Sequence, residues 1–345
     1  MFPLPDDRKK YIEKHASKFS KIMKHALNIK HEEVLLISDY GNDENNIATL
    51  LGYGYHHAAL KKGFKTNVVF QDVKKGFMHA DPHVIKTLYG LPQNSVIIVT
   101  ASNKIGRIGD VKSFRTFCKE KVHRFISATG LGDIKSIDFD LFMDAMSVNY
   151  SRMKKKGIAI KRLWDKAKEI TVKTDAGTDI TFDVENVDAL LNDGEYHNPG
   201  TGGNMPAGEV YIAPHTASGI IVVDGSIKTE SGAVLIDESL KLFVEQGRIV
   251  RMEGKYADLL EHTFEKYESR AKYPERVRMV SELGIGINPH AVLIGSTIMD
   301  EKVEGTAHVG IGSNYWFGGK IKTIYHGDQV FKNPRFYVDG KKMEM

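Results

Sequence analysis

Short apolar runs alternate with helical patterns through the first half of the chain. The runs that resemble buried strands are residues 34–38, 67–70, 95–100 and 123–127. Helical patterns lie at residues 8–27, at 43–62 with cap candidates at 43–45, and at 111–120. Continuous apolar runs are typical of strands covered on both faces, and parallel strands require a crossover segment between them. The alternation therefore predicts an α/β domain with a doubly wound, mostly parallel sheet.

The pattern changes after a helical connector at residues 139–168. Residues 170–174 and 178–184 alternate apolar and polar side chains around a turn, which is typical of a β-hairpin with one buried face. Further strand candidates lie at 209–212, 219–223, 233–237, 240–244 and 248–252, and an amphipathic helix is expected at 257–272. We therefore predict an α/β domain over residues 1–165 and a mainly antiparallel α+β domain over residues 166–345.

Composition excludes several classes of protein. The single cysteine, Cys118, excludes an intrachain disulfide framework and a cysteine-based zinc site. The net charge of +4 is spread in short runs without interleaved aromatic residues, so we expect no nucleic-acid partner. No apolar run approaches the roughly 18 residues of a membrane span, and the N-terminus lacks a signal-peptide core. We therefore expect no membrane partner and a cytoplasmic location. The chain also lacks a complete glycine motif of the kind that binds dinucleotides, so we expect no dinucleotide cofactor.

Carboxylates and imidazoles stand in glycine-rich, apolar segments of the second half. Glu209, Glu282 and His308 are each flanked by apolar residues or glycines, whereas His326 and Asp328 are alternate residues that a strand would direct to one face. A lone buried histidine is more often a hydrogen-bonded core residue, but carboxylates are seldom buried unpaired. A buried salt-bridge cluster would need several cations, which we do not expect these segments to supply. The pattern thus indicates a metal centre.

Four motifs, at residues 203–211, 281–289, 300–312 and 326–328, resemble in their order those of the aminopeptidase T and aminopeptidase S family. The members are thermophilic-type leucyl metallo-aminopeptidases, and the resemblance covers about the C-terminal half. It implies a peptide substrate, a homodimer and a site for two divalent ions of zinc, cobalt or manganese. The implied ligands are Glu209, Glu282, His308, His326 and Asp328.

The resemblance also implies roles for single residues. Two ions about 3.5–4 Å apart share a water molecule and lower its pKa, and Glu282 would be the bridging ligand or the general base. Tyr315 would donate a hydrogen bond to the tetrahedral oxyanion, although an aromatic core residue is the other interpretation. Glu301 is a weaker candidate, for a contact with a ligand rather than with the metal.

Two alternatives stay open. Related mononuclear iron dioxygenases open dihydroxypyridine rings; they carry histidine where Glu282 stands and lack the glutamate that matches Glu209. His308, His326 and Asp328 would suit such an iron site, so a dioxygenase acting on a hydroxylated, pyridine-like ring is the alternative to the expected metallo-aminopeptidase. The two retained glutamates favour two metals and hydrolysis. The third possibility is a non-catalytic binding protein on the same scaffold. Such a protein would be expected to have lost some of the metal ligands, whereas all the expected ligands are present here.

Overall fold

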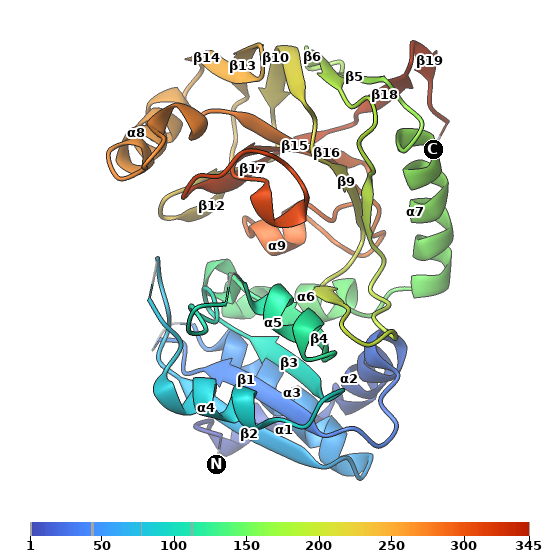
Figure 1. The fold of residues 1–345 in the computed structure, drawn as a ribbon, viewed down its shortest axis with the longest axis vertical. Helices are drawn as coiled ribbons and strands as arrows, with labels where there is room; N and C mark the ends of the chain where they lie inside the picture. The colour runs from blue at the N-terminus through green and yellow to red at the C-terminus, as the bar shows by residue number, and fades with distance from the viewer. Residues whose placement is uncertain (1, 43–44, 77, 112, 345) are drawn as a thin grey trace. The chain divides into compact units, whose positions relative to one another are not determined.

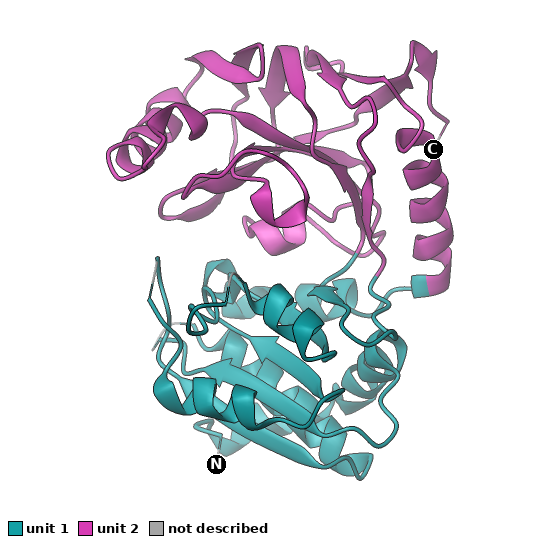
Figure 2. Ribbon diagram, in the orientation of Figure 1, with its two compact units in different colours: residues 1–150, 194–207 teal, residues 151–193, 208–345 magenta. Residues whose placement is uncertain are grey.

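The computed structural model describes residues 2–42, 45–76, 78–111 and 113–344. Its two compact units are Met1–Tyr150 with Gly194–Ala207, and Ser151–Asp193 with Gly208–Met345 (Figure 2). This division differs from the expected boundary at residue 165. Helix α7 (Tyr150–Trp164) lies largely in the second unit, because its side chains pack there: the Trp164 ring contacts that of Phe336 at 5.7 Å.

The first unit is built on a five-stranded sheet in the order β2-β1-β3-β4-β8, in which every neighbouring pair is parallel (Figure 1). The strands are β1 (Val34–Asp39), β2 (Thr66–Gln71), β3 (Val96–Thr100), β4 (Arg124–Ala128) and β8 (Gly202–Asn204). Strands β1, β3 and β4 are buried along their whole length, as the continuous apolar runs predicted. The expected parallel α/β fold is confirmed.

Helices cover this sheet. They are α1 (Asp6–Glu13), α2 (Ala16–Ile22), the π-helix η1 (Met23–Leu27), α3 (Ile47–Lys61), α4 (Pro82–Gly90), α5 (Phe114–Glu120), the 3₁₀ turns η2 (Leu131–Asp133) and η3 (Ser136–Asp138), and α6 (Phe139–Ala145). Helix α3 packs on β1 and β3, while α4 packs on β2 and α5 on β4. The single helix expected at residues 8–27 is instead three consecutive helical segments. The cap candidates Asp43 and Glu44 lie outside the described residues.

The second unit contains two seven-stranded sheets whose neighbouring strands are antiparallel, which confirms the expected β-rich half. The first follows the order β14-β13-β10-β6-β5-β18-β19. Its strands are β5 (Glu169–Lys173), β6 (Asp179–Asp183), β10 (Thr216–Val223), β13 (Leu240–Glu245), β14 (Arg248–Glu253), β18 (Arg335–Val338) and β19 (Lys341–Lys342). Strands β5, β6 and β13 alternate buried and more exposed residues, so this sheet keeps one face near solvent.

The other sheet of the second unit follows the order β12-β11-β17-β16-β15-β9-β7. Its strands are β7 (Leu190–Asn192), β9 (Glu209–Ile212), β11 (Ser226–Thr229), β12 (Gly232–Leu235), β15 (Val280–Gly286), β16 (Thr306–Gly312) and β17 (His326–Lys332). Helices α8 (Ala257–Glu268) and α9 (Thr297–Asp300) and the 3₁₀ turns η4 (Pro274–Arg276) and η5 (Tyr315–Phe317) complete the unit. Every residue of β15 and β16 is buried, so polar side chains on these strands lie in the interior.

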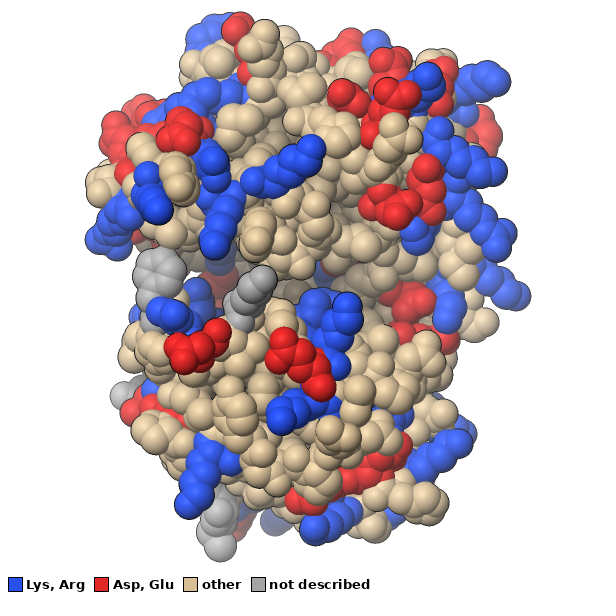
Figure 3. Space-filling view, viewed as in Figure 1, with Lys and Arg blue, Asp and Glu red and all other residues tan. Residues whose placement is uncertain are grey.

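Two surface properties bear on the expected partners. None of the helices in the described part of the chain has the length and apolar character needed to cross a bilayer. On the face drawn in Figure 3, Lys and Arg side chains are interspersed with Asp and Glu. The positive charge is therefore not gathered into one patch on that face.

Candidate metal centre

The expected ligands lie on adjacent strands of one sheet, β9, β15, β16 and β17. Each of them stands opposite a glycine of a neighbouring strand. The cross-strand pairs are Glu209 with Gly286, Glu282 with Gly310, His308 with Gly284, Asp328 with Gly310 and His326 with Gly312. Because opposite residues of paired strands project from the same face, the donors and the glycines share one side of the sheet.

The glycines provide the space that the donor side chains fill. A Cβ atom on Gly284 would lie 2.0 Å from Nε2 of His308, so the imidazole lies directly over this glycine. A Cβ atom on Gly310 would lie 2.7 Å from Cβ of Glu282 and 2.9 Å from Cε1 of His326. Larger residues at these two positions would displace the donors. The glycine-rich motifs therefore serve close side-chain packing rather than turns.

The donor atoms converge. Nε2 of His308 lies 3.5 Å from Oε1 of Glu282 and 3.7 Å from Oε2 of Glu209. Nε2 of His326 lies 3.3 Å from Oδ1 of Asp328 and 3.6 Å from Oε2 of Glu282. Among the described residues, three groups have donor atoms within 4.8 Å of one another: Glu209–Glu282–His308, Glu282–His326–Asp328 and Glu301–His308–Asp328. The structure thus brings together all the expected ligands, with Glu282 shared between two groups.

Several of these donor atoms have no hydrogen-bond partner, which fits a metal ion. His308 is fully buried, and among the residues that the structure describes neither of its ring nitrogens has a hydrogen-bond partner. Oδ1 of Asp328 also has no hydrogen-bond partner among those residues. Buried polar atoms without partners cost free energy unless a ligand or ion satisfies them. In His326, Nδ1–H donates to the carbonyl of Ser313 at 2.8 Å, which turns Nε2 toward the carboxylates and leaves it available to a metal ion. Such an arrangement is typical of a metal-binding imidazole.

The charges within the centre also indicate a site for a metal ion. Burial by itself lowers the pKa of His308, but Glu282 and the neighbouring carboxylates outweigh it and raise that pKa to about 9. Burial also lowers the pKa of His326, but the neighbouring carboxylates, mainly Asp328, outweigh this effect and raise the pKa of His326 to about 9. Burial raises the pKa of the Glu282 carboxyl. Protons on the imidazoles thus balance the carboxylates, a role that a divalent cation takes over when it binds.

Lys302 is a member of the cluster that the sequence analysis did not assign. Its side chain is fully buried, and its ammonium group forms ion pairs with the carboxylates of Glu209 and Glu301. The expectation that these segments supply no cations is therefore wrong in this one respect. The sequence does not set this lysine apart, because it stands between Glu301 and Glu304, where a charged side chain is ordinarily expected at the surface.

Tyr315 lies in η5, where it is 52% exposed and has the Nζ atom of Lys322 5.1 Å from its ring centroid. It is not a core residue. Its neighbour Trp316, also 52% exposed, lies with its ring centroid 4.8 Å from that of His326. The aromatic rings beside His326 are thus those of Trp316 and, at a centroid distance of 6.3 Å, Phe317. A catalytic role for Tyr315 stays a prediction.

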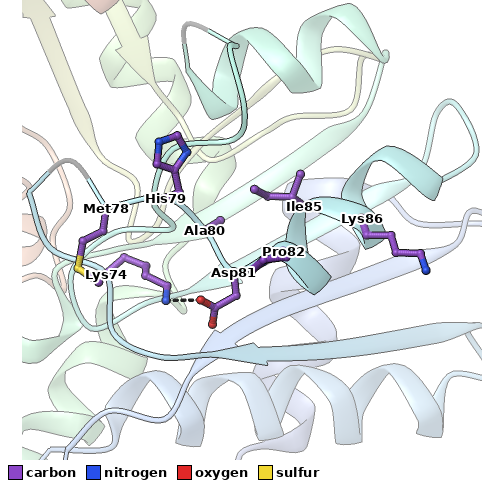
Figure 4. A pocket seen from close by; sticks show the side chains of 8 residues that line it. All are labelled: Lys74, Met78, His79, Ala80, Asp81, Pro82, Ile85 and Lys86. Carbon is purple, nitrogen blue, oxygen red and sulfur yellow. Dashed lines mark hydrogen bonds and ion pairs between the residues drawn. The ribbon is translucent and has the colours of Figure 1, made fainter.

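The first unit has a separate shallow pocket, with a volume of about 660 Å³, that contains none of the expected site residues. Figure 4 shows Nζ of Lys74 directed at the Asp81 carboxylate, at a distance of 2.5 Å. The two opposite charges satisfy each other. The arrangement therefore gives no reason to place a reaction there.

A parallel α/β unit, together with an antiparallel sheet that gathers buried imidazoles and carboxylates, defines a two-unit protein with a candidate metal centre. The chain belongs to the NicX family, described as 2,5-dihydroxypyridine 5,6-dioxygenase, whose model matches residues 144–344. The matched region contains all the expected metal ligands.

One relative carries the same name as the family model, and two solved structures share the fold. The 2,5-dihydroxypyridine 5,6-dioxygenase of Pseudomonas putida is 25% identical over 203 residues, which are 54% of this chain and 56% of that protein. The solved structure of the 2,5-dihydroxypyridine dioxygenase from Pseudomonas putida KT2440 has a TM-score of 0.71 at 17% identity and covers 99% of this chain and 96% of its own. AmpT from Thermus thermophilus has a TM-score of 0.64 at 14% identity, with 97% of both chains covered. At these identities the two structures show a shared fold.

The expectation of a metallo-aminopeptidase is wrong. The family model and the Pseudomonas putida relative both carry the name of a dioxygenase, and a hydrolase, a protease and a peptide substrate are no longer supported. The physical reason is that the motifs identify a scaffold that AmpT and the dioxygenase share. Imidazoles and carboxylates bind zinc, cobalt, manganese and iron alike, so the donor types alone do not decide the reaction.

Proposed function

We propose that this protein is a metal-dependent dioxygenase that opens a hydroxylated, nitrogen-containing aromatic ring, with iron as its metal. The observation that carries the proposal is the family match, which spans the whole of the buried donor cluster. The chemistry of the cluster agrees, since two imidazoles and a carboxylate are the donor set of many non-haem iron oxygenases. 2,5-Dihydroxypyridine, the compound in the names of the relatives, is the first substrate to test.

His308, His326 and Asp328 would hold the iron in this proposal, with Glu282 beside them. When bound, ferrous iron supplies open coordination positions and one-electron chemistry for dioxygen and the ring. The chain contributes orientation: the Ser313 carbonyl fixes the His326 ring through Nδ1–H.

Two further groups would act on the substrate. Glu282 lies between both imidazoles, and burial raises its pKa, so its carboxylate is a suitable acceptor for the proton of a ring hydroxyl. Trp316, half exposed beside His326, presents an aromatic surface on which a planar ring can stack. These contacts would hold a hydroxylated ring against the metal ligands.

The test is oxygen consumption by protein reconstituted anaerobically with ferrous iron. With 2,5-dihydroxypyridine we expect oxygen uptake and loss of the ring absorbance in equal amounts. Protein loaded with zinc and the His308→Ala variant serve as controls, and both should be inactive. Iron-loaded protein that consumes no oxygen with this compound or with other dihydroxylated rings would refute the proposal.

A further inference from the structure

We propose that Lys302 takes the place of a second metal ion, so that the centre holds one divalent ion per chain. This inference rests on the proposed function in so far as it explains a one-iron centre. It concerns a residue to which neither the motifs nor the relatives assign a role.

The donor cluster by itself has enough ligands for two ions. It contains four carboxylates and two imidazoles: Glu209, Glu282, Glu301, Asp328, His308 and His326. Glu282 belongs to two of the donor groups, Glu209–Glu282–His308 and Glu282–His326–Asp328. A carboxylate that belongs to two such groups can bridge a pair of metal ions. Some other feature must therefore decide how many ions bind.

The ammonium group of Lys302 lies against two carboxylates of this cluster. It is fully buried and paired with Oε1 of Glu209 and Oε1 of Glu301. Glu209 would be a ligand only of an ion in the Glu209–Glu282–His308 group. With one oxygen of Glu209 bonded to Lys302, an ion in that group would lie next to a fixed positive charge.

The other group of donors has different partners. Among the described residues, Glu282 and Asp328 form ion pairs with imidazoles only. An imidazole loses its proton when a metal binds, whereas the lysine keeps its charge beside two carboxylates. One divalent ion and Lys302 together bring three positive charges to the four carboxylates. Two divalent ions and Lys302 would together bring five. A single ion is therefore expected on the side of His326 and Asp328, donors that do not pair with Lys302.

The backbone holds Lys302 in this position. Its N–H donates to the carbonyl of Met299 at 3.0 Å, and its own carbonyl accepts from the N–H of Asn288 at 2.9 Å. Gly286 permits the close approach, because a Cβ atom there would lie 2.1 Å from the carbonyl oxygen of Val303. The strand that provides Glu282 thus also seats the segment that carries the lysine.

The experiment counts metal ions and does not depend on activity. Wild-type protein and the variants Lys302→Met and Lys302→Gln are stripped with a chelator and titrated with Mn²⁺. Metal content is measured after desalting, and electron paramagnetic resonance distinguishes isolated from exchange-coupled Mn²⁺. The matched control is Lys156→Met, which removes a partly exposed lysine paired with Glu304 at 2.5 Å in the same unit.

We expect one ion per chain in the wild type and in Lys156→Met, and two coupled ions in both Lys302 variants. From the charge repulsion, the second ion should bind at least about 100-fold more tightly in the variants than in the wild type. Lys302→Gln keeps a hydrogen-bond donor and serves if the methionine variant does not fold.

Two results would overturn the inference: two ions in the wild type, or one ion in a folded Lys302 variant. Neither depends on the reaction. If the wild type binds one Mn²⁺ and the variants two, but iron-loaded protein consumes no oxygen, the proposed function fails and the role of Lys302 stands. If iron-loaded protein is active and the folded variants still bind one ion, only the role of Lys302 fails.

Discussion

Alanine at Gly284 should disable the metal centre without changing any ligand. The Cβ atom would lie 2.0 Å from Nε2 of His308. Since non-bonded heavy atoms settle at about 3.5 Å or more, the imidazole must move by roughly 1.5 Å. Metal–ligand distances tolerate only about 0.2 Å, so His308 would no longer reach an ion held by the other donors. The variant tests the position of the ring and its role as a ligand together.

The expected loss of metal affinity is at least about 100-fold, which corresponds to about 2.7 kcal/mol. Overpacking should also destabilise the metal-free protein by about 1–3 kcal/mol, so its thermal unfolding is measured separately. Affinity is determined with Mn²⁺ and a competing chelator. The control is Gly90→Ala at the end of α4, where an added Cβ meets nothing within 4 Å.

Wild-type affinity and an unchanged melting temperature in Gly284→Ala would refute the reasoning. They would mean that the His308 ring does not lie over this glycine or that it is not a ligand. A loss of stability without any loss of affinity would refute the ligand role alone.

Three further predictions concern the same centre. The pKa values of His308 and His326 are raised to about 9, so their protons stabilise the fold without a metal, most strongly below pH 6.5. This contribution to stability should be lost as the pH rises through about 9. The affinity for Mn²⁺ should rise over the same pH range, because the metal binds the deprotonated imidazoles. Denaturant unfolding and chelator competition between pH 6 and 10 test both trends, and opposite slopes would contradict them. In Trp164→Phe, Co²⁺ should quench the remaining fluorescence of Trp316, whose ring lies 4.8 Å from that of His326; fluorescence that does not respond to metal would place Trp316 elsewhere. Tyr315→Phe should leave Mn²⁺ affinity unchanged because Tyr315 is half exposed, and weaker binding would show that its hydroxyl supports the ions.

The homodimer implied by the resemblance also stays a prediction. Sedimentation of the purified protein would test it, and a monomer at micromolar concentration would exclude it.

Local patterns in the sequence predicted one strand of the centre and the glycine-rich, apolar segments that form two others. Residues 209–212 are β9, and the glycine-rich motifs around Glu282 and His308 are β15 and β16. Strand β8 was not predicted, because a three-residue segment gains its partner only by pairing with β4, which lies far away in the sequence. Helix α4 was also missed, although Pro82 at its start is a recognised signal.

The candidate site was predicted in its members but not in its chemistry. The five ligands converge because alternation along a strand sets which side chains face each other, and alternation can be followed in the sequence. Lys302 was missed because no periodic pattern shows a charged side chain directed into a core. The reaction was missed because the same donors serve hydrolysis and oxygen chemistry on one fold.

Each of the five expected ligands is paired with a glycine, so the shape of the centre depends on other residues than its reactivity does. The glycines leave the room that the donor side chains fill, so exchanging one donor for another should alter which metals are accepted without rebuilding the core. A larger residue at Gly284 or Gly310, by contrast, would displace the side chains of His308, Glu282 and His326. A saturation mutagenesis screen for folded protein should therefore tolerate change at the donors more readily than at these two glycines. Evolution of a new reaction on this scaffold then requires few substitutions.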